Sequence, residues 1–516
     1  MALGTIKHRL ILAVALGLSL ALVAPSARAE DNFTDVKAKA ETGDVNAQAY
    51  LGDIYRNGKG VPQDYAQAVS WYRKAADQGN PWGQYDLALM YDYGQGVPQD
   101  YAQALAWYRK AAGQGHSGAQ GMLGDMYKNG KGVPQDYAQA VSWYRKAAEQ
   151  GNRWGQYDLA LMYSDGQGVQ QDYAQAMAWC RKAADQGHSD AQGMLGDMYK
   201  NGKGVPQDYA QAVAWYQKAA GQGHSGAQAM LGEMYKNGKG VPQDYTQAVS
   251  WCRKAADQGN PWGQYDLALM YDYGQGVPQD YAQAIAWYRK AADQGHSDAE
   301  DMLGDMYKNG KGVPQDYAQA VAWYRKAADQ GNPWGQCDLA LMYSDGQGVQ
   351  QDYAQAVRWF RKAAEQGHAD ALSEIGYMYR NGVGVAENDV LAYAYSNIAA
   401  SRGSKNGTNN RPIYAGLLSP TQLTEGQKLS SSWQPGMPLP TKTTTWIVRS
   451  QKAPTKAQVA AERPCQPPTG GTVRYSDRCT NGDCIRTFEN GCTKRFQAPY
   501  CYDSLSGGWT WKPDGC

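Results

Sequence analysis

Hydrophobic and polar positions follow one pattern through most of this chain, and the pattern returns every 36 residues. In the first copy, apolar residues lie three or four positions apart, which is the spacing of one face of an amphipathic helix. These residues are Tyr65, Ala68, Val69, Tyr72, Ala75 and Ala76. Asp64 is placed to cap the start of this helix and Gly79 to end it. The pattern predicts a helix, called B, over about residues 64 to 78.

A second apolar stripe precedes helix B and predicts a partner, helix A. It contains Ala47, Leu51, Ile54 and Tyr55 and stops at Asn57-Gly58. In later copies helix A begins at Asn80-Pro81 or His116-Ser117, where the first residue of each pair is a cap. His116 directly follows the glycine that ends a helix B, so we expect the dipole of that helix to favour a cation there.

The pairs recur strictly enough to predict a solenoid, in which each pair buries its apolar face on its neighbours. The aspartate of the QDY motif marks nine copies, and Asn388 takes the tenth position. The nine are Asp64, Asp100, Asp136, Asp172, Asp208, Asp244, Asp280, Asp316 and Asp352.

The residues shared by the copies carry a family resemblance. They are Ala47, Leu51, Gly52, Tyr55, Gly58, Gly60, Val61, Asp64, Ala68, Trp71, Tyr72, Ala75, Ala76 and Gly79. This pattern resembles the Sel-1-like repeat, a helix-pair family related to tetratricopeptide repeats, over residues 46 to about 403. The resemblance implies an all-α fold, a right-handed α/α superhelical solenoid, that acts as an adaptor for protein partners and has no catalytic activity or cofactor of its own.

Regions outside the repeats complete the predicted organisation. The basic start, the apolar run from Leu10 to Val23 and the sequence Ala27-Arg28-Ala29 predict a bacterial signal peptide cleaved near Ala29. We therefore expect a periplasmic or secreted protein, and no stretch is long enough to predict a membrane span. The expected divisions are residues 1–29 signal peptide, 30–45 N-terminal cap, 46–403 ten repeats, 404–440 C-terminal capping helices, 441–464 linker and 465–516 cysteine-rich domain.

The charge balance argues against nucleic acid as a partner. Removal of the signal peptide leaves 47 Lys and Arg against 49 Asp and Glu, and a phosphate backbone requires a concentrated basic face. From Gln434 onward, 11 basic residues stand against 6 acidic ones. That excess keeps an envelope polysaccharide open as a partner of the C-terminal region.

Six cysteines crowd the C-terminal region and predict a small β domain held by three disulfides, with 15 possible pairings. They are Cys465, Cys479, Cys484, Cys492, Cys501 and Cys516. Asn490-Gly491, between alternating segments, predicts a two-residue hairpin turn. Trp509 and Trp511 lie two positions apart and so share one face, where they either stack on a sugar or enter the core.

The repeats carry no convincing catalytic or metal site. The Gly-Lys-Gly loop that ends at Gly60 has neither the spacing nor the hydroxyl residue of a phosphate loop. Histidines equivalent to His116 recur one per unit, too far apart to share a metal ion. Cys180, Cys252 and Cys337 are expected to be buried free thiols. Some secreted cysteine-rich relatives have paired cysteines in every repeat and are linked to β-lactam chemistry, and this chain lacks those pairs.

Differences among the copies indicate a candidate partner-binding face on helix A. Units two, four, seven and nine, here called Trp units, carry large residues at three positions of one helical face. These residues are Trp82, Tyr85, Leu89, Trp154, Tyr157, Leu161, Trp262, Tyr265, Leu269, Trp334 and Leu341, with Cys337 in the remaining place. Units one, three, five, six and eight, here called Asp units, carry Asp53, Asp125, Asp197, Glu233 and Asp305 in place of the leucines.

Two interpretations of this face stay open. The aromatic and acidic patches alternate along a concave surface that binds an extended peptide or a partner protein, or each tryptophan packs on helix B of the preceding unit. Residues 82–201 also closely resemble residues 262–381, which indicates duplication of a five-unit block. For the whole protein we expect an exported, non-enzymatic scaffold. The alternatives are a peptidoglycan- or glycan-binding protein acting through its cysteine-rich domain, and a β-lactam or cell-wall hydrolase.

Overall fold

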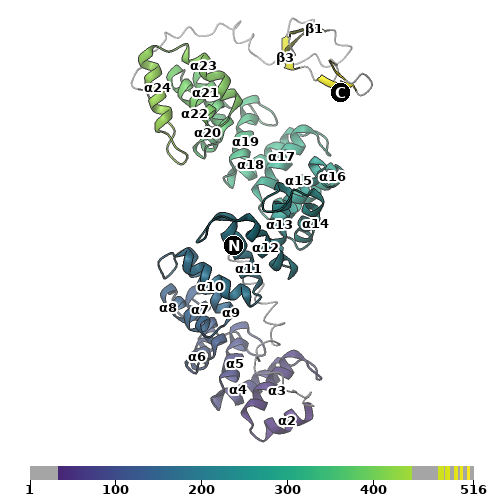
Figure 1. The fold of residues 1–516 in the computed structure, drawn as a ribbon, viewed down its shortest axis with the longest axis vertical. Coiled ribbons are helices and arrows are strands. Elements are labelled where there is room, and N and C mark those ends of the chain that lie inside the picture. Colours follow the sequence, from purple (N-terminus) through teal and green to yellow (C-terminus); the bar gives the residue numbers. More distant parts are fainter. Residues whose placement is uncertain are drawn as a thin grey trace. The chain divides into compact units, whose positions relative to one another are not determined.

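The computed structural model describes residues 33–443, 475–480, 483–488, 493–497, 500–503 and 508–511. These residues belong to two compact units that divide after Thr441. The first unit is an α/α solenoid whose helices follow one another in chain order from α2 to α24 (Figure 1). The predicted helix pairs are confirmed.

Each repeat contributes one odd-numbered A helix and one even-numbered B helix. The A helices are α3 (Val45–Asn57), α5 (Pro81–Tyr93), α7 (Ser117–Asn129), α9 (Arg153–Asp165), α11 (Ser189–Asn201), α13 (Ser225–Asn237), α15 (Pro261–Tyr273), α17 (Ser297–Asn309), α19 (Pro333–Asp345) and α21 (Ala369–Asn381). The B helices are α4 (Tyr65–Asp77), α6 (Tyr101–Gly113), α8 (Tyr137–Glu149), α10 (Tyr173–Asp185), α12 (Tyr209–Gly221), α14 (Tyr245–Asp257), α16 (Tyr281–Ala292), α18 (Tyr317–Asp329), α20 (Tyr353–Glu365) and α22 (Asp389–Ser401). Helices α2 (Phe33–Glu41), α23 (Lys405–Ala415) and α24 (Pro420–Ser432) flank the repeats.

The turn between the two helices of a unit is built by glycine and a capping aspartate. Gly58 ends α3 in the left-handed region at φ 66°, and the Asp64 side chain accepts a hydrogen bond from the Gln67 backbone N–H at 2.9 Å. In the next unit, a Cβ on Gly96 would lie 2.3 Å from the carbonyl oxygen of Tyr65. The glycine loop therefore packs directly on the start of the preceding B helix, and this contact explains why it contains glycine.

A tyrosine on helix B and a glycine on helix A set the spacing within a unit. Tyr72 is fully buried, and a Cβ on Gly52 would lie 2.5 Å from its ring. The same contact recurs between Gly124 and Tyr144. Close contact between the two helices of a unit thus accounts for the glycine inside helix A.

Successive A helices approach one another more closely than successive B helices do. The A helices contact each other in the pairs α3–α5, α7–α9, α11–α13, α13–α15 and α17–α19, and no two successive B helices of the ten described repeats reach that level of contact. The A helices thus line the side of the solenoid on which neighbouring units are closest. Where a Trp unit is followed by an Asp unit, as between α5 and α7, the A helices lie further apart.

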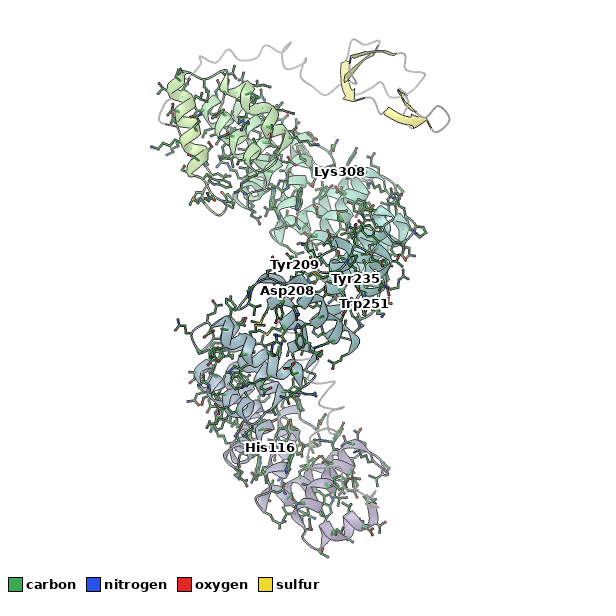
Figure 2. All side chains as sticks on the ribbon, viewed as in Figure 1. His116, Asp208, Tyr209, Tyr235, Trp251 and Lys308 are labelled. Carbon is green, nitrogen blue, oxygen red and sulfur yellow. The ribbon has the colours of Figure 1, made fainter. Side chains whose placement is uncertain are left out.

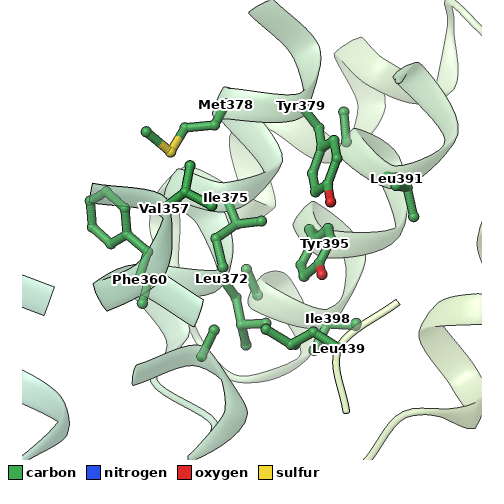
Figure 3. Packing of buried hydrophobic residues seen from close by; sticks show 14 of the residues in the cluster. Val357, Phe360, Leu372, Ile375, Met378, Tyr379, Leu391, Tyr395, Ile398 and Leu439 are labelled. Atoms are coloured by element: carbon green, nitrogen blue, oxygen red, sulfur yellow. The ribbon is translucent and has the colours of Figure 1, made fainter. Parts of the chain in front are cut away.

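The C-terminal end of the solenoid is closed by apolar packing and a short extended segment. Phe360, Ile375, Tyr395 and Leu439 belong to one buried cluster (Figure 3). The Tyr395 hydroxyl donates to the carbonyl oxygen of Pro440 at 2.7 Å. Helix α24 begins with a capping box that involves Ser419.

The second unit contains two antiparallel groups of strands. Strands β1 (Tyr475–Thr480), β2 (Asp483–Phe488) and β3 (Thr493–Gln497) form a sheet in the order β1-β2-β3, and β4 (Tyr500–Asp503) pairs with β5 (Gly508–Trp511). Strands β2 and β3 flank the predicted hairpin turn.

Several sequence predictions lie outside the described part of the structure. They are the signal peptide, most of the linker and the side chains of all six C-terminal cysteines and of Trp509 and Trp511. Among the described helices, none has the length and apolar character needed to cross a bilayer.

Candidate partner-binding face

At each Trp unit, the tryptophan contacts the histidine that begins the next A helix. Trp82 on α5 meets His116 edge-on, with ring centroids 4.3 Å apart, and Tyr85 stacks on the same imidazole at 4.5 Å. His116 is labelled in Figure 2. The arrangement recurs for Trp154 with His188, Trp262 with His296 and Trp334 with His368, at 4.1 to 4.3 Å. We call these four places the Trp junctions.

These contacts leave much of the indole in solvent. Trp82, Trp262 and Trp334 are 51%, 54% and 57% exposed, whereas Trp154 is half-buried. The predicted tyrosines Tyr85, Tyr157 and Tyr265 and leucines Leu89, Leu161, Leu269 and Leu341 are all half-buried. The ring contact is made with the following unit and not with helix B of the preceding unit. The groove and packing interpretations of this face both stay predictions.

The histidine at a Trp junction is a neutral helix cap. Its Nδ1 accepts a hydrogen bond from the Ala119 backbone N–H at 3.1 Å, so Nδ1 carries no proton. Burial lowers the pKa of His116 to about 4, and it also lowers the pKa of His296 and His368. The expectation of a favoured cation is wrong, because this residue begins helix A, where the dipole disfavours positive charge.

A different contact joins an Asp unit to the Trp unit that follows it. Asn80 caps α5 by accepting from the Gly83 N–H at 2.8 Å, and its Nδ2 donates to Asn46 of the preceding A helix at 2.9 Å. An ion pair between Arg56 and Asp86, at 2.8 Å, reinforces this junction. Equivalent pairs join Lys236 to Asp266 and Lys308 to Asp338. A Trp unit therefore meets the Asp unit before it through polar contacts and the next unit through an aromatic contact with histidine.

The acids that replace the leucines act within their own unit. The Tyr72 hydroxyl donates to Asp53 at 2.7 Å, and Tyr144 donates to Asp125 at the same distance. Glu233 is the exception: the tyrosine of its own unit is replaced by Cys252, and it pairs instead with Lys200 on α11 of the preceding unit at 2.7 Å. The predicted acidic patches at these positions are therefore largely committed to internal hydrogen bonds and are not free recognition groups.

A ladder of buried glutamines was not anticipated from the sequence. Gln84 lies on α5 and donates to the carbonyl oxygen of Ala76 on the preceding B helix at 3.2 Å. It also accepts from Gln114, at the end of its own unit, at 2.8 Å. These bonds satisfy carbonyls at the ends of B helices. The signal in the sequence was a glutamine on the buried side of nearly every helix A, for which an apolar stripe has no explanation.

The described residues offer little for catalysis. Cys180, Cys252 and Cys337 are buried free thiols, as predicted. Burial raises the pKa of Cys180 to about 12, so its reactive thiolate is disfavoured at neutral pH. Within the part of the chain that the structure describes, no three His, Cys, Asp or Glu side chains converge to hold a metal ion.

Comparison with known proteins assigns the repeats. The Sel1 repeat model matches residues 45–80, 83–116, 117–152, 155–188, 189–224, 225–260, 263–296, 297–332, 335–368 and 369–404. No curated protein matches the chain. Among solved structures, c5321, a protective antigen present in uropathogenic Escherichia coli strains displaying an SLR fold, is 42% identical. The alignment covers 78% of this chain and 88% of that chain, with a TM-score of 0.68.

A Sel1 repeat protein from Oxalobacter formigenes is 32% identical, over 47% of this chain and 96% of its own length, with a TM-score of 0.44. The repeat model covers more than half of the sequence, and the helix pairs, their caps and their glycine contacts are the same from unit to unit. The chain belongs to the Sel1 repeat family.

Proposed function

We propose that this protein is an exported, non-catalytic scaffold that binds a protein partner through the face formed by its A helices. Sel1 repeat solenoids commonly serve as protein-interaction scaffolds, and the A helices here form an extended surface of ten units. Export is inferred from the signal-peptide pattern of residues 1–29 alone.

The observation that carries the proposal is the exposure of Trp82, Trp262 and Trp334. Each indole leaves about half of its surface in solvent, yet an edge contact with a histidine helps to fix its orientation. A large, pre-oriented aromatic side chain loses little conformational entropy on binding, and tryptophan is enriched among residues that dominate interface energies. Repetition along one face favours a partner that contacts several units at once.

Chemical crosslinking in the native envelope, with mass-spectrometric comparison of the captured proteins, tests this function. The informative variant combines Trp82→Ala, Trp262→Ala and Trp334→Ala. We expect loss of a specific captured protein while the melting temperature falls by only a few degrees.

A matched control removes apolar groups exposed elsewhere on the solenoid. Tyr353→Ala combined with Ile413→Ala alters α20 and α23, where these side chains are 39% and 60% exposed, and we expect normal capture. If the tryptophan variant captures the same proteins as the native chain, this face is not the binding surface.

A further inference from the structure

The two copies of the duplicated block differ in charge on their A helices. Residues 82–201 align with residues 262–381 at a constant displacement of 180. Four neutral A-helix positions of the first copy are acidic in the second, and only one change, Asp197 to Tyr377, removes an acid from an A helix. The four pairs are Gly118 and Asp298, Gln120 and Glu300, Gly121 and Asp301, and Met194 and Glu374.

The added acids lie on neighbouring A helices of the second copy. Asp301 on α17 interacts electrostatically with Asp298 and Asp305 of its own helix and with Asp338 on α19. Glu374 on α21 is influenced in the same way by Asp345 of α19. The carboxylates therefore form a continuous acidic stretch across α17, α19 and α21, which we call the acidic face.

Few basic side chains neutralise the acidic face. Lys308 on α17, labelled in Figure 2, pairs with Asp338 at 3.2 Å. Arg380 on α21 pairs with Glu387 and Asp389, near the start of α22, at 3.1 and 3.4 Å. Asp298 accepts a hydrogen bond from Asn332 Nδ2 and Asp305 accepts one from the Tyr324 hydroxyl, both at 2.6 Å. These bonds leave the negative charges in place, and Asp298, Asp301, Asp305 and Glu374 have no ion pair with Lys or Arg within the described part of the chain.

Asp301 differs from the usual surface acid because it is buried. It is only 8% exposed, and one of its carboxylate oxygens is buried without a hydrogen-bond donor. Burial and the neighbouring carboxylates raise its pKa to about 8. A buried carboxylate that lacks a partner destabilises a fold. The equivalent Gly121 shows that the helix pair folds without it, so Asp301 is better explained by an external cation than by packing.

Exposed aromatic rings also lie on A helices of the second copy. Trp262 on α15, Trp334 on α19 and Tyr377 on α21 are 54%, 57% and 50% exposed. The aliphatic stems of lysine and arginine pack on such rings, and their charged ends are attracted to the ring face. Carboxylates together with exposed aromatic rings can therefore bind lysine and arginine side chains.

The distribution of the acids favours a polymer over a single ion. No three His, Cys, Asp or Glu groups of the described chain are arranged to hold one metal ion, and the carboxylates extend over three successive A helices. A metal requires oxygen ligands that converge on one point. An extended chain that carries several positive charges can pair with the carboxylates of successive A helices.

We propose that the acidic face of α17, α19 and α21 docks a lysine- or arginine-rich segment of the protein partner. This inference rests on the proposed scaffold function and specifies the chemistry of the segment that is bound.

Fluorescence anisotropy at pH 9, above the pKa of about 8 at which Asp301 ionises, tests the proposal with the mature full chain and a labelled alternating arginine–glycine peptide. The variant Asp298→Asn, Asp301→Asn, Glu374→Gln removes three charges and keeps the size of each side chain. We expect about a tenfold loss of affinity, and native binding that weakens as salt rises. Since Asp301→Asn removes a buried charge, the variant is expected to melt no lower than the native protein.

A matched control removes the same charge from the B helices. Asp257→Asn, Asp293→Asn and Asp329→Asn alter three exposed acids at the C-terminal ends of α14, α16 and α18, and we expect native affinity. Equal affinity of all three proteins for the peptide would overturn the proposal. So would displacement of the peptide by equimolar spermidine or calcium, because that outcome identifies a site for small cations.

The same variants separate this proposal from the scaffold function. If the tryptophan variant loses its captured partner while the three-charge variant keeps it, the scaffold function stands and the docking of a basic segment is wrong. If both variants lose the partner and only the three-charge variant loses the peptide, both proposals are supported.

Discussion

The two copies of the duplicated block, from α5 to α11 and from α15 to α21, fold alike but carry different charges. Leu105 and Ile285 exchange one buried apolar group for another. Four A-helix positions exchange a neutral residue for an acid, and two of these acids, Glu300 and Asp301, are buried. A repeated fold thus keeps its helix pairs while the charge on the A helices changes.

Of the changes that test this comparison, substitution of Asp301 should have the largest effect on the free energy of unfolding. Its pKa in the folded protein, about 8, lies above the value of 3.8 for a free aspartate. The folded state therefore binds more protons between these values, and its stability falls as pH rises through that window. Asp301→Asn should raise the unfolding free energy by about 5 kcal/mol at pH 8 and by much less near pH 4.

Urea unfolding at the two pH values measures this effect. In the first copy, Gly121→Asp should lower the unfolding free energy at pH 8. The acid has room to enter, because no atom outside the backbone of its own helix lies within 4 Å of a Cβ placed there. A native protein whose stability does not change between these pH values would contradict the burial of a charged Asp301.

Substitution of His116 should have a smaller effect on the free energy of unfolding, with the reverse dependence on pH. Its folded pKa, about 4, lies below the value of 6.5 for a free histidine. The unfolded state binds more protons between these values, so stability falls as pH decreases, by up to about 3 kcal/mol. His116→Asn keeps a cap of the kind found at Asn80 and should remove this loss.

His296, in the second copy, sharpens the comparison. Asp298 lies close enough to oppose the lowering of its pKa, and the equivalent residue in the first copy is Gly118. His296→Asn should therefore change the acid sensitivity less than His116→Asn does. Hydrogen exchange at the starts of α7 and α17 distinguishes the two sites, and equal protection at low pH would contradict the role of Asp298.

Tryptophan removal should affect the two copies equally. Trp82→Ala and Trp262→Ala each delete a half-exposed indole whose contact with histidine is 4.3 Å in both copies. We expect each to lower the unfolding free energy by about 1 kcal/mol. Thermal unfolding measures it. A loss above about 3 kcal/mol would show that the indole is mainly a packing residue.

The smallest expected effect on the free energy of unfolding comes from a tyrosine–aspartate hydrogen bond that both copies contain. The Tyr108 hydroxyl donates to Asp92 at 3.3 Å and the Tyr288 hydroxyl to Asp272 at 3.4 Å. A double-mutant cycle of Tyr108→Phe and Asp92→Ser should give a coupling of about 1 kcal/mol.

Units four and nine provide the control for that cycle. Their B helices have Cys180 and Phe360 in place of the tyrosine, and Ser164 and Ser344 stand in place of the aspartate. Ser164→Asp should therefore bring no stabilisation, because no tyrosine hydroxyl is present to pair with it. Stabilisation by that change would indicate that the aspartate acts through some other group.

Much of the fold was predictable because its determinants are local. The Asp64 cap, the left-handed Gly58 and the apolar stripe of helix B each depend on residues within one or two helical turns. The 36-residue spacing then determines the order of the helices. The candidate face was also predictable in part, since Trp82, Trp262 and Trp334 are exposed on helix A as the helical periodicity required.

Contacts between units were decided by the tertiary structure. Stacking between helices decides that His116 caps the start of α7, that Asp53 accepts from Tyr72 and that Trp82 contacts the following unit. The sequence by itself determined ten helix pairs and the alternation of two unit types. Only the packed solenoid showed how the two types contact each other, because the contacting residues belong to different helices, and proximity across a unit boundary cannot be inferred from helical periodicity.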